Sequence, residues 1–206
     1  MNNARPLIPS PLRSGALFGL LMLGLTACAS KVDSPTTYML PTTVPEQQYS
    51  TTLGLAIAPV SISSYLDNEG IVMELNDIEV YQARQHLWAE DIGKQLQQQL
   101  QQQLAASLPR AQVVLKGQTL QSNMPQREVR VSVSRFQGSY DGSAIAQGQW
   151  QLLDAKGQLL KQQSFKLEQP LTRDGYPTLV RALGAAWDKV ASELATAVAL
   201  ASEQER

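Results

Sequence analysis

The sequence predicts an α+β domain in which two main helices pack on one face of an antiparallel or mixed β-sheet. Two stretches, residues 88–108 and 176–198, repeat apolar residues at the spacing of an amphipathic helix. From residue 111 to residue 167, by contrast, apolar and polar residues alternate with the period of strands and are interrupted by turn signals. These two periods predict the fold class.

The first strand of the folded part is expected at residues 53–60, a continuous apolar run that we interpret as a central strand ending near Pro59. A loop with a turn signal at residues 67–70 follows it. Residues 71–75 and 78–83 then predict two further short strands.

The first helix is predicted from apolar residues that recur every four positions between Trp88 and Leu108, before Pro109 ends it. Glu90 and Asp91 would favour its first turn by complementing the helix dipole. A four-residue repeat drifts by about 40° per step around a helix of 3.6 residues per turn, so the stripe spirals as if along a twisted sheet. His86 is interpreted as a side chain at the start of this helix.

The polar face of this helix is almost entirely glutamine, and no charged residue occurs between Lys94 and Arg110. One interpretation is a solvated face of low complexity. The other is an interface, because the buried centres of interfaces are depleted of charge. The candidate interface residues on this helix are Gln95, Gln98, Gln99 and Gln102.

An antiparallel meander is expected after the helix. Three valines alternate with polar residues over 129–134, Asp141-Gly142 is a hairpin signal, and a turn at 154–157 leads into residues 159–167. The strand between the turns carries small residues on one side, so we expect a bulky element, most simply a helix, to lie close over them. These residues are Ala144, Ala146 and Gly148.

The last predicted element is a helix whose apolar residues follow steps of three and four from Tyr176 to Val198, with Pro177 tolerated in its first turn. From Leu194 to Ala201 every residue except Thr196 is apolar or small. Either this is a plain alanine-rich helix end, or protein covers more than one of its sides. On the second interpretation Leu194 and Val198 are candidate interface residues.

The N-terminal 27 residues have the features of a secretory signal peptide. Arg5 and Arg13 precede an apolar core at residues 15–25, and no acidic residue accompanies them. That core is too short to span a bilayer, which needs roughly 20 apolar residues. We therefore expect residues 1–27 to be an export signal.

Cys28, the only cysteine, follows Leu25-Thr26-Ala27, a pattern that resembles the bacterial lipobox. The resemblance implies that the Cys28 thiol carries a diacylglycerol and that Cys28 becomes the first residue. Two or three acyl chains would anchor the chain far more firmly than a single one. Ala29 and Ser30 occupy positions where an aspartate would retain an enterobacterial lipoprotein at the inner membrane, so we expect the outer membrane, facing the periplasm. The alternative is an ordinary thiol in a soluble protein.

Residues 28–51 are rich in Ser, Thr, Pro and Gln, which predicts a flexible, lipid-anchored tether before a single periplasmic domain at residues 52–206. The one apolar island in the tether is residues 38–40. It either docks on the domain as a short strand or is an accidental cluster.

The composition indicates a binding module without a cofactor. A formal net charge of −1 and a pI near 5.9 provide no basic surface for nucleic acid. His86 is the only histidine, so a His-based metal cluster cannot form, and no nucleophile motif or phosphate-binding glycine loop is found. We expect no enzyme activity.

Several short segments, taken together and in order, resemble the PqiC (YmbA) family of auxiliary transport lipoproteins. One departure is Asp91, where the family pattern would have proline. The segments that carry the resemblance are Ala58-Pro59-Val60, Tyr65-Leu66-Asp67, Ile71-Val72, Trp88-Ala89-Glu90, Arg135-Phe136-x-Gly138, residues 144–150 and Tyr176-x-x-Leu179-Val180.

The resemblance implies an outer-membrane lipoprotein that docks a PqiB-like MCE-domain protein, a periplasm-spanning tunnel for lipids, and supports envelope integrity. Because an MCE partner is a closed ring, we also expect self-association, with a matching ring as one form. The alternatives are an auxiliary lipoprotein of an ABC-type MCE importer, a structural envelope lipoprotein without a transport role, and an enzyme with an unfamiliar site near His86 and the loop acids.

Overall fold

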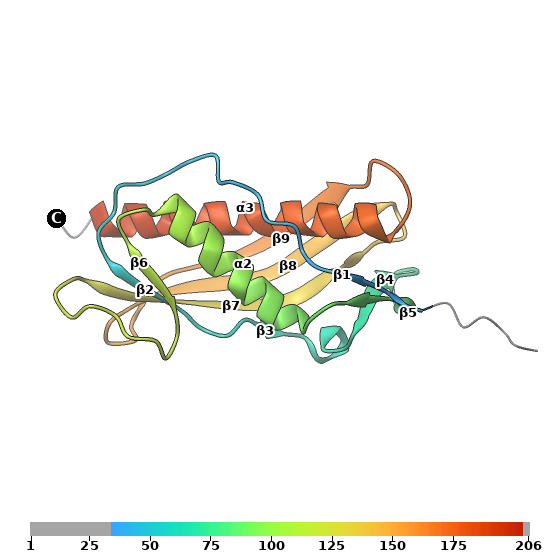
Figure 1. The fold of residues 1–206 in the computed structure, drawn as a ribbon, viewed down its shortest axis with the longest axis horizontal. Helices are drawn as coiled ribbons and strands as arrows, with labels where there is room; N and C mark the ends of the chain where they lie inside the picture. The colour runs from blue at the N-terminus through green and yellow to red at the C-terminus, as the bar shows by residue number, and fades with distance from the viewer. Residues whose placement is uncertain (1–33, 204–206) are drawn as a thin grey trace, which may run out of the picture. The chain divides into compact units, whose positions relative to one another are not determined.

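The computed structural model describes residues 34–203, so the expected signal peptide and Cys28 lie outside the described residues. Nine strands, a short 3₁₀ helix and two α-helices follow one another in this part of the chain (Figure 1). In order they are β1 (Thr36–Tyr38), β2 (Gly54–Ile57), β3 (Ser61–Ile62), η2 (Ser64–Leu66), β4 (Gly70–Glu74), β5 (Val80–Trp88), α2 (Ile92–Ser107), β6 (Gln112–Leu115), β7 (Gln126–Gly138), β8 (Ser143–Asp154), β9 (Leu159–Pro170) and α3 (Tyr176–Glu203).

The strands form one mixed sheet in the order β1-β5-β4-β7-β2-β6, and β3 also pairs with β7. β2 lies between β6 and β7 and is parallel to both, as expected of a central strand. β7, β8 and β9 form the antiparallel meander that the turn signals predict. The α+β prediction, with a mixed sheet and two helices packed against it, is confirmed.

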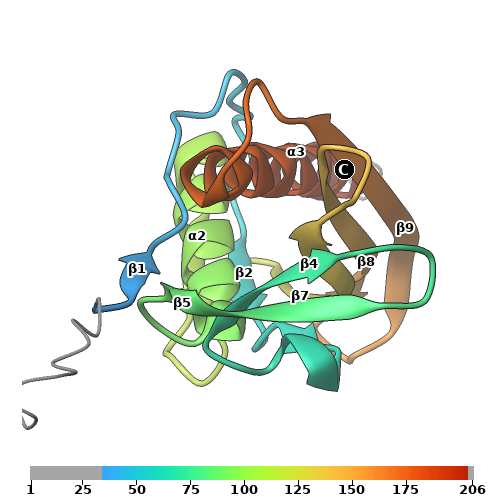
Figure 2. The same ribbon diagram turned by 90° about the vertical axis from the view of Figure 1, so that its right-hand side faces the viewer.

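The two helices pack on each other and on the sheet, and β7, β8 and β9 curve beneath and beside α3 (Figure 2). The spiralling leucine stripe of α2 is fully buried at Leu96, Leu100 and Leu104. Trp187 of α3 is also fully buried, and its Nε1 donates a hydrogen bond to the Leu96 carbonyl oxygen at 3.0 Å. The predicted apolar faces of the two helices therefore meet in one core.

The first helix begins four residues later than its apolar repeat suggests. β5 continues to Trp88, because residues 86–88 pair with β1, and α2 begins at Ile92. Asp91 caps it by accepting a hydrogen bond at Oδ1 from the Lys94 backbone N–H at 2.8 Å. His86 therefore lies on a strand, and the departure from proline at Asp91 supplies the helix cap.

The small residues of β8 have two separate causes. Ala144 and Ala146 are fully buried on the strand that packs against α3, as predicted. Gly148 is instead crowded by the neighbouring strands β7 and β9. A Cβ there would lie 2.1 Å from the Ser132 carbonyl oxygen and 2.9 Å from Cζ of Phe165. Its lack of a side chain accommodates the backbone of β7 beside an irregularity in the β7–β8 pairing.

The folded unit begins at Pro35, and not at residue 52 as the composition suggests. β1 pairs in parallel with β5, so the apolar island at residues 38–40 docks as a short strand. The chain then crosses the two helices before entering β2 (Figure 1). We refer to residues 35–51 as the N-terminal strap, which replaces most of the flexible tether that the sequence predicts.

Candidate functional site

The N-terminal strap is held on α2 by a row of glutamines. The Leu40 backbone N–H donates to Oε1 of Gln95 at 3.0 Å, and Gln99 and Gln103 donate from Nε2 to the carbonyl oxygens of Pro41 and Thr43 at 2.5 and 2.6 Å. Residues four apart lie on one face of a helix, so each amide meets the next part of the strap. We refer to Gln95, Gln99 and Gln103 as the glutamine row.

The opposite side of α2 uses glutamine in the same way. Gln97 donates to the Ile57 carbonyl oxygen at 3.2 Å, and Gln101 donates to that of Val113 at 3.1 Å. An uncharged amide can satisfy buried backbone groups without the cost of burying a charge. The absence of charge at these five glutamines thus has an explanation within the chain.

This finding corrects part of the predicted interface. Gln95 and Gln99 are buried under the chain's own strap and present no surface to a partner. Gln98 and Gln102 are exposed. The face is covered at Gln95 and Gln99, but the cover is intramolecular.

Asp188 of α3 ties the strap to both helices. Its Oδ1 accepts hydrogen bonds from Nε2 of Gln103 at 2.9 Å and of Gln99 at 3.2 Å, and its Oδ2 accepts one from Oγ1 of Thr43 at 2.6 Å. Burial raises the pKa of Asp188, while these three hydrogen bonds act in the opposite direction. Local periodicity gives no signal for this residue, since its partners Gln99 and Gln103 lie 89 and 85 positions away.

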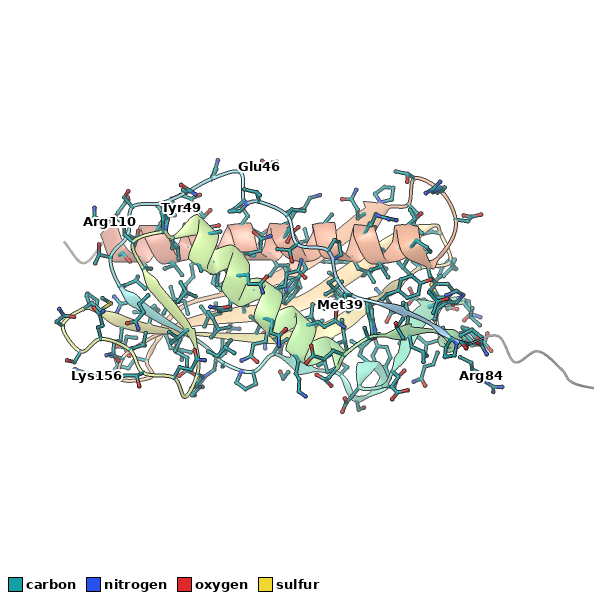
Figure 3. All side chains as sticks on the ribbon, in the orientation of Figure 1. Met39, Glu46, Tyr49, Arg84, Arg110 and Lys156 are labelled. Atoms are coloured by element: carbon teal, nitrogen blue, oxygen red, sulfur yellow. The ribbon has the colours of Figure 1, made fainter. Side chains whose placement is uncertain are left out.

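Pro41 of the strap also packs directly on α3. A Cβ at Gly184 would lie 2.7 Å from Cγ of Pro41, so the strap approaches the helix at a residue that has no side chain. Met39, Glu46 and Tyr49 mark the path of the strap over the helices in Figure 3. The strap is therefore a packed part of the domain.

The C-terminal half of α3 is covered by the same chain. Leu194 and Val198, the other predicted interface residues, are exposed by 0% and 1% and belong to the core. The hydroxyl groups of Tyr49 and Thr196 lie 2.8 Å apart, which places the end of the strap over this half of the helix. Protein does cover more than one side of it, but that protein is not a partner.

His86, the only histidine, connects β1, β5 and α3. Its Nδ1 lies 2.9 Å from the Tyr38 hydroxyl oxygen, and its ring stacks on that of Tyr176 with centroids 4.0 Å apart. Burial raises the pKa of the Tyr176 phenol, with smaller contributions from Tyr81 and Tyr38. The arrangement joins three elements through ring stacking and one hydrogen bond.

Two further findings concern the described part of the chain. Within residues 34–203, no group of three or more His, Cys, Asp or Glu side chains is placed to hold a metal ion. No helix in the same range is both long enough and apolar enough to cross a membrane.

Comparison with known proteins identifies the family. Residues 38–195 match the family described as the ABC-type transport auxiliary lipoprotein component. The chain belongs to this family. The match begins within the strap and ends within α3, so it includes the glutamine row, Asp188 and His86, but not Thr196 or Val198. The family is one of transport auxiliary lipoproteins, and not one of enzymes.

A relative from E. coli and two solved structures are similar to this chain over most of its length. The chain is 32% identical over 182 residues to the intermembrane transport lipoprotein PqiC of Escherichia coli K12, covering 87% of this chain and 94% of that protein. A crystal structure of an uncharacterized protein has a TM-score of 0.69 at 28% identity, covering 81% of this chain and 99% of the other. One of a Xanthomonas campestris protein, with a TM-score of 0.68 at 16% identity and coverage of 82% and 98%, shares the fold. The predicted resemblance to the PqiC family is confirmed.

Proposed function

We propose that this chain is an outer-membrane lipoprotein of an intermembrane lipid transport system, anchored through Cys28, and that it docks a periplasm-spanning MCE-domain partner to that membrane. The observation that carries the proposal is the family match over residues 38–195. Its similarity to an intermembrane transport lipoprotein of E. coli supports it. The acyl anchor rests on the lipobox at residues 25–28.

Because the strap is packed on the domain, the link between the proposed anchor and the domain is short. Pro35, the first residue of the compact unit, is seven positions after Cys28 (35 − 28), a span of about 25 Å at full extension. A tether running to residue 52 would span 24 residues (52 − 28), or about 85 Å. The shorter span suits a protein that fixes the end of a tunnel at a membrane surface.

The test compares three forms of the full chain by membrane fractionation and affinity purification. The wild type should be acylated at Cys28 by intact mass spectrometry, fractionate with the outer membrane, and copurify with an MCE-domain protein. Cys28→Ala should lose the acyl groups and the membrane association. Ala29→Asp is the matched control, because by the enterobacterial sorting rule it keeps the acyl anchor but moves the protein to the inner membrane.

Different results would support different functions. A mature N-terminus other than Cys28, or wild-type protein in the inner-membrane fraction, would contradict the proposal. Copurification with the MCE protein of an ABC-type importer would favour the importer alternative. Recovery with peptidoglycan and no MCE protein would favour a structural lipoprotein.

Self-association as a ring is a separate part of the proposal, supported by the symmetry expected of an MCE partner. The glutamine row, Leu194 and Val198 do not supply its contact, because these side chains are buried within the chain itself. A ring would therefore have to use other surfaces of the domain.

A further inference from the structure

The hairpin between β4 and β5 exposes an unusual group of apolar side chains. Ten large apolar side chains are exposed within residues 34–203, and five of them lie at this end of the sheet. Tyr140 lies beside the hairpin because it follows the end of β7, where Gly138 pairs with Met73 of β4. We refer to the five as the apolar tip: Leu75 (54% exposed), Ile78 (86%), Val80 (48%), Tyr81 (43%) and Tyr140 (63%).

The turn of the hairpin is ordered, so the exposure is built into its backbone. Oδ1 of Asn76 accepts hydrogen bonds from the backbone N–H groups of Ile78 and Glu79, both at 3.0 Å. The Leu75 N–H donates to the Glu79 carbonyl oxygen at 2.8 Å. These bonds fix the turn in which Ile78 is exposed.

Both faces of the hairpin present apolar side chains. Glu74 lies opposite Val80, and Met73 lies opposite Tyr81. Because consecutive residues of a strand point to opposite faces, Val80 and Tyr81 project from different faces. A hairpin that docked on a flat protein surface would need only one apolar face, whereas apolar residues on both faces suit immersion in an apolar medium.

The strap enters the domain beside the strand that follows the turn of this hairpin. β1 runs parallel to β5, with Thr36 opposite His86. Cys28 is eight positions before Thr36 (36 − 28), and His86 is eight positions after Ile78 (86 − 78). At about 3.5 Å per residue, eight residues span at most about 28 Å, so the length available to the anchor matches the length of extended chain from the turn to His86. Two labelled residues in Figure 3 mark the two ends of the domain. Arg84 of β5 lies at one end, and Lys156, in the turn between β8 and β9, lies at the other.

We infer that the apolar tip inserts into the leaflet that holds the acyl chains of Cys28, an inference that rests on the anchoring proposed above. Ile78 and Leu75 reach the acyl boundary, and Tyr81 and Tyr140 lie at the level of the headgroups, where tyrosine is enriched. Insertion is shallow, because Asp77 and Glu79 flank Ile78 and must stay hydrated.

The charge of the hairpin specifies the lipid. No Lys or Arg occurs in residues 75–83, and the Glu74 carboxylate is already paired with Arg135 at 2.5 Å. Anionic headgroups would therefore repel Asp77 and Glu79, whereas the ammonium group of phosphatidylethanolamine can pair with them. The hairpin fits a mainly zwitterionic surface.

The test uses the full acylated chain in phosphatidylethanolamine-rich vesicles, with one environment-sensitive fluorophore on an introduced cysteine. Cys28 is the only natural cysteine, so once it is acylated the new thiol is the only one free to react. Ile78→Cys is the test variant. Leu159→Cys is the matched control, because Leu159 is 54% exposed but follows the β8–β9 turn at the other end of the sheet. We expect a blue shift and several-fold stronger quenching by a lipid-borne quencher at position 78 alone, weakening as phosphatidylglycerol is added.

Intact mass and vesicle flotation of the same samples separate failure of the inference from failure of the anchoring. An acylated chain that floats, but whose label at position 78 is quenched only from water, would overturn the inference and leave the anchoring intact. A label protected from both quenchers, increasingly so at high protein-to-lipid ratio, would mean that a second copy covers the tip, and would also overturn it. An unacylated chain that does not float would contradict both.

Discussion

Nε2 of Gln103 on α2 donates a hydrogen bond to Oδ1 of Asp188 on α3 at 2.9 Å, and the same nitrogen lies 2.6 Å from the Thr43 carbonyl oxygen. One amide thus joins the two helices and the strap. This contact converts a segment that has the composition of a linker into part of the domain. It also makes the mechanical connection between the proposed anchor and the core testable by single substitutions.

Gln103→Ala should lower the free energy of unfolding by about 1–3 kcal/mol, because it removes the amide donor from two part-buried hydrogen bonds, to the Thr43 carbonyl oxygen and to the Asp188 carboxylate. Gln102→Ala is the matched control on the same helix. Gln102 is exposed, so its change should stay within about 0.5 kcal/mol, and the alanine helix propensity is common to both variants. Urea denaturation measures both. Equal midpoints would show that the glutamine row does not stabilise the strap.

Asp188 should give the domain a pH-dependent stability that Asp188→Asn lacks. Burial raises its pKa, so the folded chain binds a proton there more readily than the unfolded chain does. The stability from this group is therefore complete below the unfolded pKa of about 3.9 and is lost as the pH rises through the higher folded pKa. Glu193, whose pKa burial also raises, is present in both proteins and cancels in the difference.

The measurement for Asp188 is urea denaturation of wild type and Asp188→Asn from acidic to neutral pH. The wild-type free energy of unfolding, relative to that of the variant, should fall as the pH rises from the unfolded pKa. Parallel profiles would show that Asp188 has the same proton affinity in the folded and unfolded chains.

Gly148→Ala should destabilise the sheet by about 1–3 kcal/mol, because its Cβ would meet the Ser132 carbonyl oxygen at 2.1 Å and the backbone would have to shift. Gln149→Ala, at the exposed neighbouring position, should change the stability by no more than about 0.5 kcal/mol. Thermal unfolding of the two variants compares them. A Gly148→Ala protein as stable as wild type would mean that the β7–β8 irregularity adapts without cost.

Glutamate at both Gln98 and Gln102 should leave the oligomeric state unchanged, because both side chains are exposed and a charge at either position stays solvated. Light scattering of the mature chain in detergent measures the mass. The two new charges are four residues apart and should cost the helix about 0.2–0.5 kcal/mol, which denaturation can verify separately. Dissociation of a wild-type oligomer by this double change would instead place the contact at these two residues.

The sequence by itself determined the features that depend on local periodicity. The four-residue leucine repeat of α2 and the alternating valines at 129–133 predicted which side chains are buried, and Asp141-Gly142 predicted the hairpin between β7 and β8. These patterns are reliable because the geometry of a helix or strand fixes which neighbours share a face, whatever the rest of the chain does. The family resemblance rests on short segments of the sequence taken in order, and it was confirmed.

The tertiary structure decided what covers each face. A charge-free row of glutamines and an apolar helix end both indicate that water is excluded, but neither pattern says whether a partner or the same chain excludes it. The cover proved to be the strap, whose contacts with Gln95, Gln99 and Gln103 join residues 55, 58 and 60 positions apart. The same applies to the end of β5, where pairing with β1 kept residues 86–88 in a strand ahead of the helix. Contacts at such separations depend on the path of the whole chain, which local periodicity does not encode.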